Sequence, residues 1–132
     1  MPRRVISSQQ FCLHALQEFD WLLEFGFLGP EVSEYRLAFG SSEMRIQVLY
    51  DAREGRMVVL IAGAVGERYP QATLDCLYVA TDFGPPQDIR SVIRSEKMIL
   101  PVLQSQRSAL EKVLPLLQTD SLAELLLRCN GR

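Results

Sequence analysis

The clearest pattern of hydrophobic and polar positions lies between residues 35 and 63. In its middle, apolar and polar side chains alternate over residues 44–50, as a strand with one buried face requires. Two further segments flank this stretch: residues 32–39, where apolar positions face inward and Glu34 and Arg36 face outward, and residues 57–62, which are apolar on both faces. We therefore expect three antiparallel strands, with residues 57–62 forming the covered, central one.

Turn and helix signals surround these strands. Residues 40–43 make a tight connection, and residues 51–56 form a hairpin loop in which Gly55 supplies a positive φ. Before the strands, apolar residues repeat at helical spacing, which predicts a first helix with Ser8 as its N-cap that runs to about residue 24. Gly26 then breaks the helix, and Gly29 with Pro30 indicates a loop.

In the C-terminal half, apolar residues recur at the spacing of a helix. An apolar stripe predicts helix over residues 87–117, where Pro101 should either kink the helix or divide it in two, and Pro115 should distort its end. A last helix is expected over residues 121–128. Residues 73–81 fit a short fourth strand or a helical turn equally well.

The predicted fold class is α+β in a single domain over residues 1–132. It consists of an N-terminal helix, a three- to four-stranded antiparallel meander, and C-terminal helices packed on one sheet face. The chain is 48% hydrophobic and 23% charged, which is ordinary for a globular domain. Its longest apolar run is about half of what a membrane crossing needs, so we expect no membrane association.

The cysteine pattern bears on location. Cys12, Cys76 and Cys129 are far apart, and each lies next to apolar residues. We expect three buried free thiols, because the count is odd and no pair has the spacing of a redox or metal motif. Free thiols without a secretion signal favour a reducing cytoplasm.

Charge is distributed unevenly along the chain. Residues 5–88 carry five arginines and twelve acids, a net charge of −7, whereas residues 89–132 carry +3. Four acids, Asp20, Glu24, Glu31 and Glu34, would form one negative surface if the first helix and first strand are neighbours. Such a surface would complement a basic partner protein. The alternative is that these carboxylates are simply solvated.

No cluster of residues has a catalytic or ligand-binding signature. His14 is the only histidine, and Cys12 two residues away lies on another side of the helix, so no catalytic pair or zinc site is expected. The turn at residues 63–66 lacks the lysine and hydroxyl of a phosphate loop. We therefore expect no catalysis, no cofactor, no metal and no nucleic-acid binding.

The outer sheet face leaves two alternatives open. Arg36, Arg45 and Gln47 should share this face, where cross-strand salt bridges are their expected use. A homodimer that pairs through the sheet or the C-terminal tail is one alternative function. A small-ligand binder with Tyr35, Tyr50 or Arg36 in a cup on the sheet is the other.

The order of these elements resembles the small α+β immunity proteins of bacterial polymorphic-toxin and contact-dependent inhibition systems. The resemblance is carried by residues 19–27 at the end of the first helix, the 46–53 hairpin arm and the 116–120 turn before a short last helix. It implies a cytoplasmic, non-enzymatic inhibitor that occludes a cognate toxin domain. The binding surface varies most in such families, so the resemblance assigns no contact residue.

Overall fold

Five antiparallel strands follow one another in the sheet in the same order as in the chain. The computed structural model describes residues 6–63, 70–119 and 122–129. Its strands are β1 Leu28–Ser33, β2 Arg36–Gly40, β3 Met44–Asp51, β4 Arg56–Gly63 and β5 Gln71–Thr73. The α+β class is confirmed, and the meander has five strands rather than three or four.

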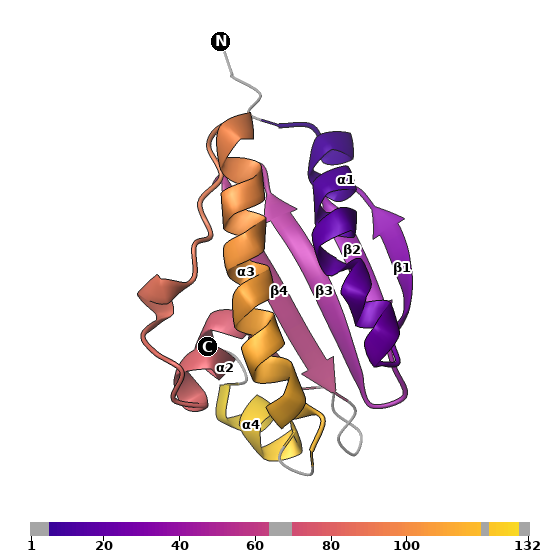
Figure 1. Ribbon diagram of the computed structural model, residues 1–132, viewed down its shortest axis with the longest axis vertical. Coiled ribbons are helices and arrows are strands. Elements are labelled where there is room, and N and C mark those ends of the chain that lie inside the picture. The colour runs from indigo at the N-terminus through magenta and orange to yellow at the C-terminus, as the bar shows by residue number, and fades with distance from the viewer. Residues whose placement is uncertain (1–5, 64–69, 120–121, 130–132) are drawn as a thin grey trace.

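The helices gather on one side of this sheet. They are α1 Ser8–Phe19, α2 Leu74–Ala80, α3 Glu96–Leu117 and α4 Leu122–Cys129, with 3-10 helices η1 Asp20–Phe25 and η2 Pro86–Asp88. Figure 1 shows α1 and α3 side by side across one face of the sheet, with α4 near one end of it. Within the described part of the chain, none of the helices combines the length and hydrophobicity needed to span a membrane.

Alternation along β3 explains why one face is covered. Met44, Ile46, Val48 and Tyr50 are buried under the helices, while the side chains between them point to the other face and are exposed or half-buried. The antiparallel register extends this division to the neighbouring strands, where Leu37, Phe39, Val59 and Ile61 complete the inner face. These residues belong to one connected core cluster that reaches every helix from α1 to α4.

A capping box sets the start of α1. The Ser7 hydroxyl accepts a hydrogen bond from the Gln10 backbone N–H, and the Ser7 N–H donates to the Gln10 side chain. Ser7, not Ser8, is therefore the N-cap, and the Ser8 hydroxyl instead accepts from the Tyr35 N–H. The helix tightens into η1 after Phe19 and ends at Gly26, whose φ of 91° favours glycine.

The predicted strand over residues 32–39 is divided in two. Tyr35 has a φ of 56°, so the chain turns sharply between β1 and β2. Gly29 and Pro30, expected as loop, instead lie in the edge strand β1. The middle of the sheet is consequently β3, and the outward residues Val58 and Leu60 of β4 are half-buried rather than covered.

The long C-terminal helix begins later than its apolar stripe predicts. Residues 89–95 run extended along the β3–β4 turn, where the Ile93 N–H donates to the Gly55 carbonyl and the Met57 N–H donates to the Ser91 carbonyl, both at 2.8 Å. The helix α3 starts only at Glu96 and continues through Pro101 and Pro115 to Leu117. Of the two alternatives expected at Pro101, the division of the helix is therefore wrong, and the kink stays a prediction.

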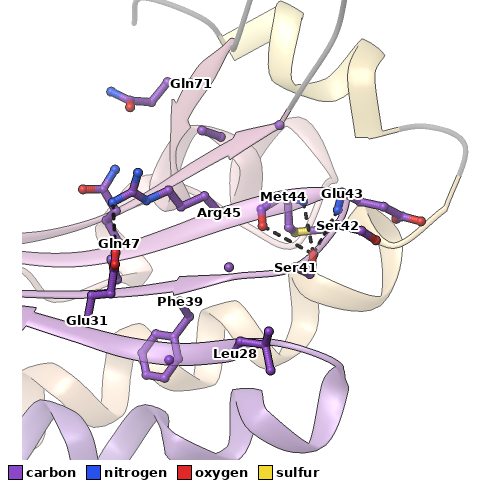
Figure 2. A pocket seen from close by; sticks show the side chains of 15 residues that line it. Leu28, Glu31, Phe39, Ser41, Ser42, Glu43, Met44, Arg45, Gln47 and Gln71 are labelled. Carbon is purple, nitrogen blue, oxygen red and sulfur yellow. Dashed lines mark hydrogen bonds and ion pairs between the residues drawn. The ribbon is translucent and has the colours of Figure 1, made fainter.

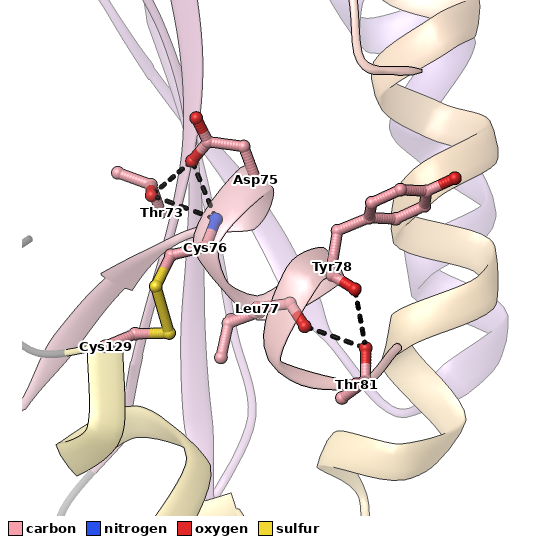
Figure 3. Close-up of a disulfide and its surroundings, with 7 residues drawn as sticks. All are labelled: Thr73, Asp75, Cys76, Leu77, Tyr78, Thr81 and Cys129. Carbon is pink, nitrogen blue, oxygen red and sulfur yellow. Dashed lines mark hydrogen bonds between the residues drawn. A yellow bond between two sulfur atoms is a disulfide. The ribbon is translucent and has the colours of Figure 1, made fainter. Parts of the chain in front are cut away.

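Residues 74–80 are helical, which resolves the open alternative for this segment in favour of a helix. The Thr73 side chain accepts a hydrogen bond from the Cys76 N–H and so caps α2. Cys76 also forms a disulfide with Cys129 at the end of α4, across a Cα–Cα distance of 6.0 Å (Figure 3). Of the three cysteines only Cys12 is a free, buried thiol, so the expectation of three free thiols is wrong. The predicted cap at Asp120 and stop at Asn130 lie outside the described residues.

Candidate functional site

The sheet face that the helices leave uncovered carries a mixed surface, which we call the outer sheet face. The strand register places its side chains in rows that cross β1 to β4. Its members are Glu31, Arg36, Ala38, Arg45, Gln47, Leu49, Asp51, Arg56, Val58, Leu60 and Ala62. Apolar side chains occupy the middle, and charged ones lie toward the strand ends and the β1 edge. The predicted positions of Arg36, Arg45 and Gln47 on this face are confirmed.

A shallow hollow of about 780 Å³ lies on the outer sheet face near the β2–β3 turn (Figure 2). Small residues, Ala38, Gly40 and Ala62, line it together with the longer side chains of Arg45 and Leu28. The hollow therefore exists because short side chains stand beside long ones on the same sheet face. Its polar and apolar lining suits a partner's side chain as well as a small molecule.

An ion pair crosses this face, as expected. The Arg45 guanidinium lies 3.9 Å from the Glu31 carboxylate, with 53% and 85% of the two side chains exposed. Such exposed pairs contribute at most about 1 kcal/mol to stability because water screens them. The pair therefore leaves both charges able to interact with a partner.

The four acids proposed for partner binding are not all brought together. Asp20 and Glu24 lie on η1, after the C-terminal end of α1. Glu31 lies on the outer sheet face, and Glu34 is in the β1–β2 turn. That turn sits at the other end of α1, since the Tyr35 N–H donates to the Ser8 hydroxyl. Only Asp20 and Glu24 share a local surface.

Two exposed apolar side chains accompany that local acidic pair. Leu23 is 46% exposed and Phe25 is 49% exposed. We name Asp20, Leu23, Glu24 and Phe25 the η1 patch. Sequence reasoning placed the η1 leucines in the helix stripe without choosing between Leu22 and Leu23, and the structure buries Leu22 alone. α-helical spacing does not separate the two, because both follow Phe19 at positions that share its face. The 3-10 form of η1, in which residues three apart align, places Leu22 in the core.

Contacts of buried and half-buried side chains beneath the η1 patch hold it against α3. Trp21 is only 8% exposed, packs edge-on against Phe25, and has the Arg107 guanidinium 6.0 Å from its ring centroid. Arg107 also pairs with Glu18 at 3.5 Å. At the end of α3, the Gln118 side chain donates to the Phe25 carbonyl at 3.3 Å. These contacts hold the patch in place while its outer side chains face solvent.

The tyrosines considered for a ligand cup serve the core instead. Tyr50 donates to the Ile93 carbonyl at 2.9 Å, and Tyr35 donates to the Ile6 carbonyl at 2.7 Å, on the helix side of the sheet. Arg36 points to the opposite face. Burial raises the pKa of the Tyr50 phenol above its ordinary value, and the neighbouring Tyr35 adds to this shift. Burial, followed by the hydrogen bond to Asp88, likewise raises the pKa of Tyr78.

The histidine, cysteine and carboxylate side chains of the described residues are scattered over the fold. That part of the chain contains no group of three or more histidine, cysteine, aspartate or glutamate side chains that could hold a metal ion. His14 is half-buried on α1, and the Cys12 thiol lies 3.7 Å from the Ser33 carbonyl. Of the predicted turn at residues 63–66, only Gly63 is described.

Comparison with family models, curated proteins and solved structures found no significant match to this chain. The arrangement of residues itself supplies two surfaces suited to contact with another protein. One is the η1 patch at the end of α1, and the other is the outer sheet face with its hollow.

Proposed function

We propose that this chain is a non-enzymatic protein-binding module and, more specifically, an immunity-type inhibitor that occludes a cognate toxin domain. The resemblance in element order suggests the class of protein. The η1 patch is the observation that carries the proposal. Exposed apolar side chains beside unpaired charges are typical of protein contact sites, because they combine hydrophobic burial with electrostatic steering.

The chemistry of the patch suggests the kind of partner. Leu23 and Phe25 would fill an apolar depression, and Asp20 and Glu24 would lie against lysine or arginine side chains. Aromatic side chains at the centre of an interface commonly provide most of its binding energy. The supporting contacts of Trp21 and Arg107 reduce the entropic cost of binding, because η1 is already ordered.

Co-expression with the product of the neighbouring gene tests this proposal. We expect the wild-type chain to bind that product and to suppress its toxicity. Phe25→Ser and Glu24→Lys should weaken binding by about tenfold or more, since both remove interactions at the patch centre. Leu127→Ser and Glu54→Lys are matched controls, because both residues are exposed and lie outside the η1 patch, on α4 and in the β3–β4 turn. Equal effects from patch and control variants, or no salt-sensitive partner, would contradict the proposal.

Location in the cytoplasm belongs to the same proposal. Disulfides are rare in that compartment, so the disulfide between Cys76 and Cys129 argues against this part of the proposal and makes the two cysteines its test. Acid quenching of cells followed by alkylation of free thiols measures their state directly. Alkylation of both cysteines supports the cytoplasm, whereas recovery of the disulfide would indicate an oxidising compartment.

A further inference from the structure

The outer sheet face has an apolar centre that is open to a partner. Leu49, Val58 and Leu60 lie side by side on β3 and β4 and are half-buried, and Ala38 and Ala62 flank them. Neighbouring side chains of the same face provide this partial burial. A second layer over these residues would remove further apolar surface from water, which is favourable by roughly 25 cal/mol per Å².

Charges of opposite sign mark the two ends of the middle strand. Arg45 lies near the start of β3 and Asp51 at its end, and both side chains are on the outer sheet face, where Arg56 of β4 is opposite Asp51 in the register. Six residues of extended strand separate them by about 20 Å. On β1 and β2 the two charges are closer together and in the reverse order: Glu31 lies in the row of Gln47, and Arg36 lies one row nearer to Asp51.

These charges distinguish between the two ways in which a second copy can lie on this face. A two-fold axis parallel to the strands would place Arg45 over its own equivalent, which is repulsive. A two-fold axis that lies between the two sheets and perpendicular to the strands instead places each strand antiparallel to its own copy. Arg45 of one copy then meets Asp51 of the other, and Arg36 meets Ala38 with Glu31 beside it. Arg56, which is opposite Asp51 in the register, then lies beside Arg45 of the other copy and offsets part of this attraction. Of the two orientations compared, only this one nevertheless brings Arg45 to Asp51 and Arg36 close to Glu31.

We propose that the outer sheet face binds a second copy of this chain, with the two-fold axis across the strands. The apolar centres of the two sheets pack together, and two symmetric sets of Arg45–Asp51 and Arg36–Glu31 pairs align them. Sheets that pack face to face keep their strands within about 30° of each other, which this arrangement allows. The η1 patch is not part of this interface, so the dimer is independent of the function proposed above.

Equilibrium sedimentation of the purified full-length chain tests the dimer. We expect a concentration-dependent monomer–dimer equilibrium that weakens as salt is raised, because the aligning pairs lie at the exposed rim. Arg36→Glu should raise the dimer dissociation constant by about tenfold or more, since it places two like-charge pairs across the interface. Arg90→Glu, an exposed arginine away from this face, should leave the dissociation constant unchanged.

A charge exchange gives the decisive measurement. Glu31→Arg alone should weaken the dimer as Arg36→Glu does, whereas the double variant with both changes should recover dimerisation because the pair is restored with its signs reversed. Circular dichroism shows whether each variant is folded. Leu60→Asp, at the apolar centre, supplies a second disruption that does not depend on these pairs. A wild-type monomer at all concentrations, or a dimer indifferent to the single charge reversals, would overturn the proposal.

Discussion

Gly29 holds the start of the edge strand in a backbone conformation that side chains rarely adopt. Its φ is 120°, and a Cβ there would lie 2.8 Å from the Ala38 carbonyl oxygen of the neighbouring strand. We expect Gly29→Ala to lower the free energy of unfolding by about 1–3 kcal/mol, because neither backbone can move away cheaply. Urea denaturation measures this loss.

Gly40 provides the matched control for that substitution. It lies in β2, and a Cβ there would meet no atom within 4 Å. Gly40→Ala should therefore leave stability unchanged or raise it slightly, by restricting the unfolded chain. Equal losses for the two variants would show that strain at Gly29 is not the cause.

Ionisation of Tyr50 should make the free energy of unfolding depend on pH in the alkaline range. Since burial raises the pKa of its phenol above the ordinary 10.0, the folded protein holds this proton more tightly than the unfolded chain does. The contribution is complete below about pH 10 and is lost as pH rises through the folded pKa. We expect the free energy of unfolding from urea denaturation to fall as pH rises above about 10, where the tyrosine of the unfolded chain ionises.

The Tyr50→Phe variant separates this effect from general alkaline denaturation. It should be less stable than wild type at pH 8, because the hydrogen bond to the Ile93 carbonyl is lost. Its stability should nevertheless decline less steeply above pH 10. Some decline will remain, since the pKa of Tyr78 is shifted in the same direction. Parallel pH profiles for the two proteins would contradict the assignment to Tyr50.

Among the elements, those defined by local periodicity were predictable. The alternation within residues 44–50, which only Leu49 interrupts, and the apolar run over residues 57–62 led to β3, β4 and their turn with nearly correct bounds. The start of α3 was not predictable, because Ile89, Val92 and Ile93 have helical spacing but lie extended beside the β3–β4 turn. Hydrogen bonds to residues far away in sequence decided this segment, and local pattern does not report them.

The disulfide fastens α4 to α2. Its two cysteines are 53 residues apart, so in the oxidised protein the link restricts the unfolded chain by up to about 4 kcal/mol in the chain-entropy account. We expect Cys76→Ser, or reduction of wild type, to lower the melting temperature measured by circular dichroism. Cys12→Ser should keep its sensitivity to reductant. Three reactive thiols in the oxidised, unfolded chain would contradict the pairing.

At the scale of the whole molecule, the described core is one connected cluster that includes Trp21. We therefore expect a single cooperative unfolding transition. Trp21 is the only tryptophan, and it belongs to η1 and lies against Arg107 of α3. Its fluorescence therefore reports on the packing of η1 against α3. Far-UV circular dichroism reports on all helices and strands. The two transitions should coincide in urea, and separate midpoints would indicate parts that unfold independently.

The candidate site was only partly accessible from the sequence, for a geometrical reason. Asp20 and Glu24 are close in sequence and remain close in space. Glu31 and Glu34 were grouped with them by sequence proximity alone. The turn at Tyr35 reverses the chain, so Glu34 lies at the far end of α1, and the register of β1 directs Glu31 to the outer sheet face. A surface that depends on a turn and a register cannot be obtained from charge counts.

The identity of strand order and chain order has a consequence for synthesis on the ribosome. All five strands precede α3, which supplies much of the cover for the inner face. At about 5–20 residues per second, the residues between the end of β5 and the end of α3 take roughly 2–9 s to be made. During that interval part of the apolar inner face of the nascent sheet is exposed to solvent. This is the stage at which a chaperone would bind the chain.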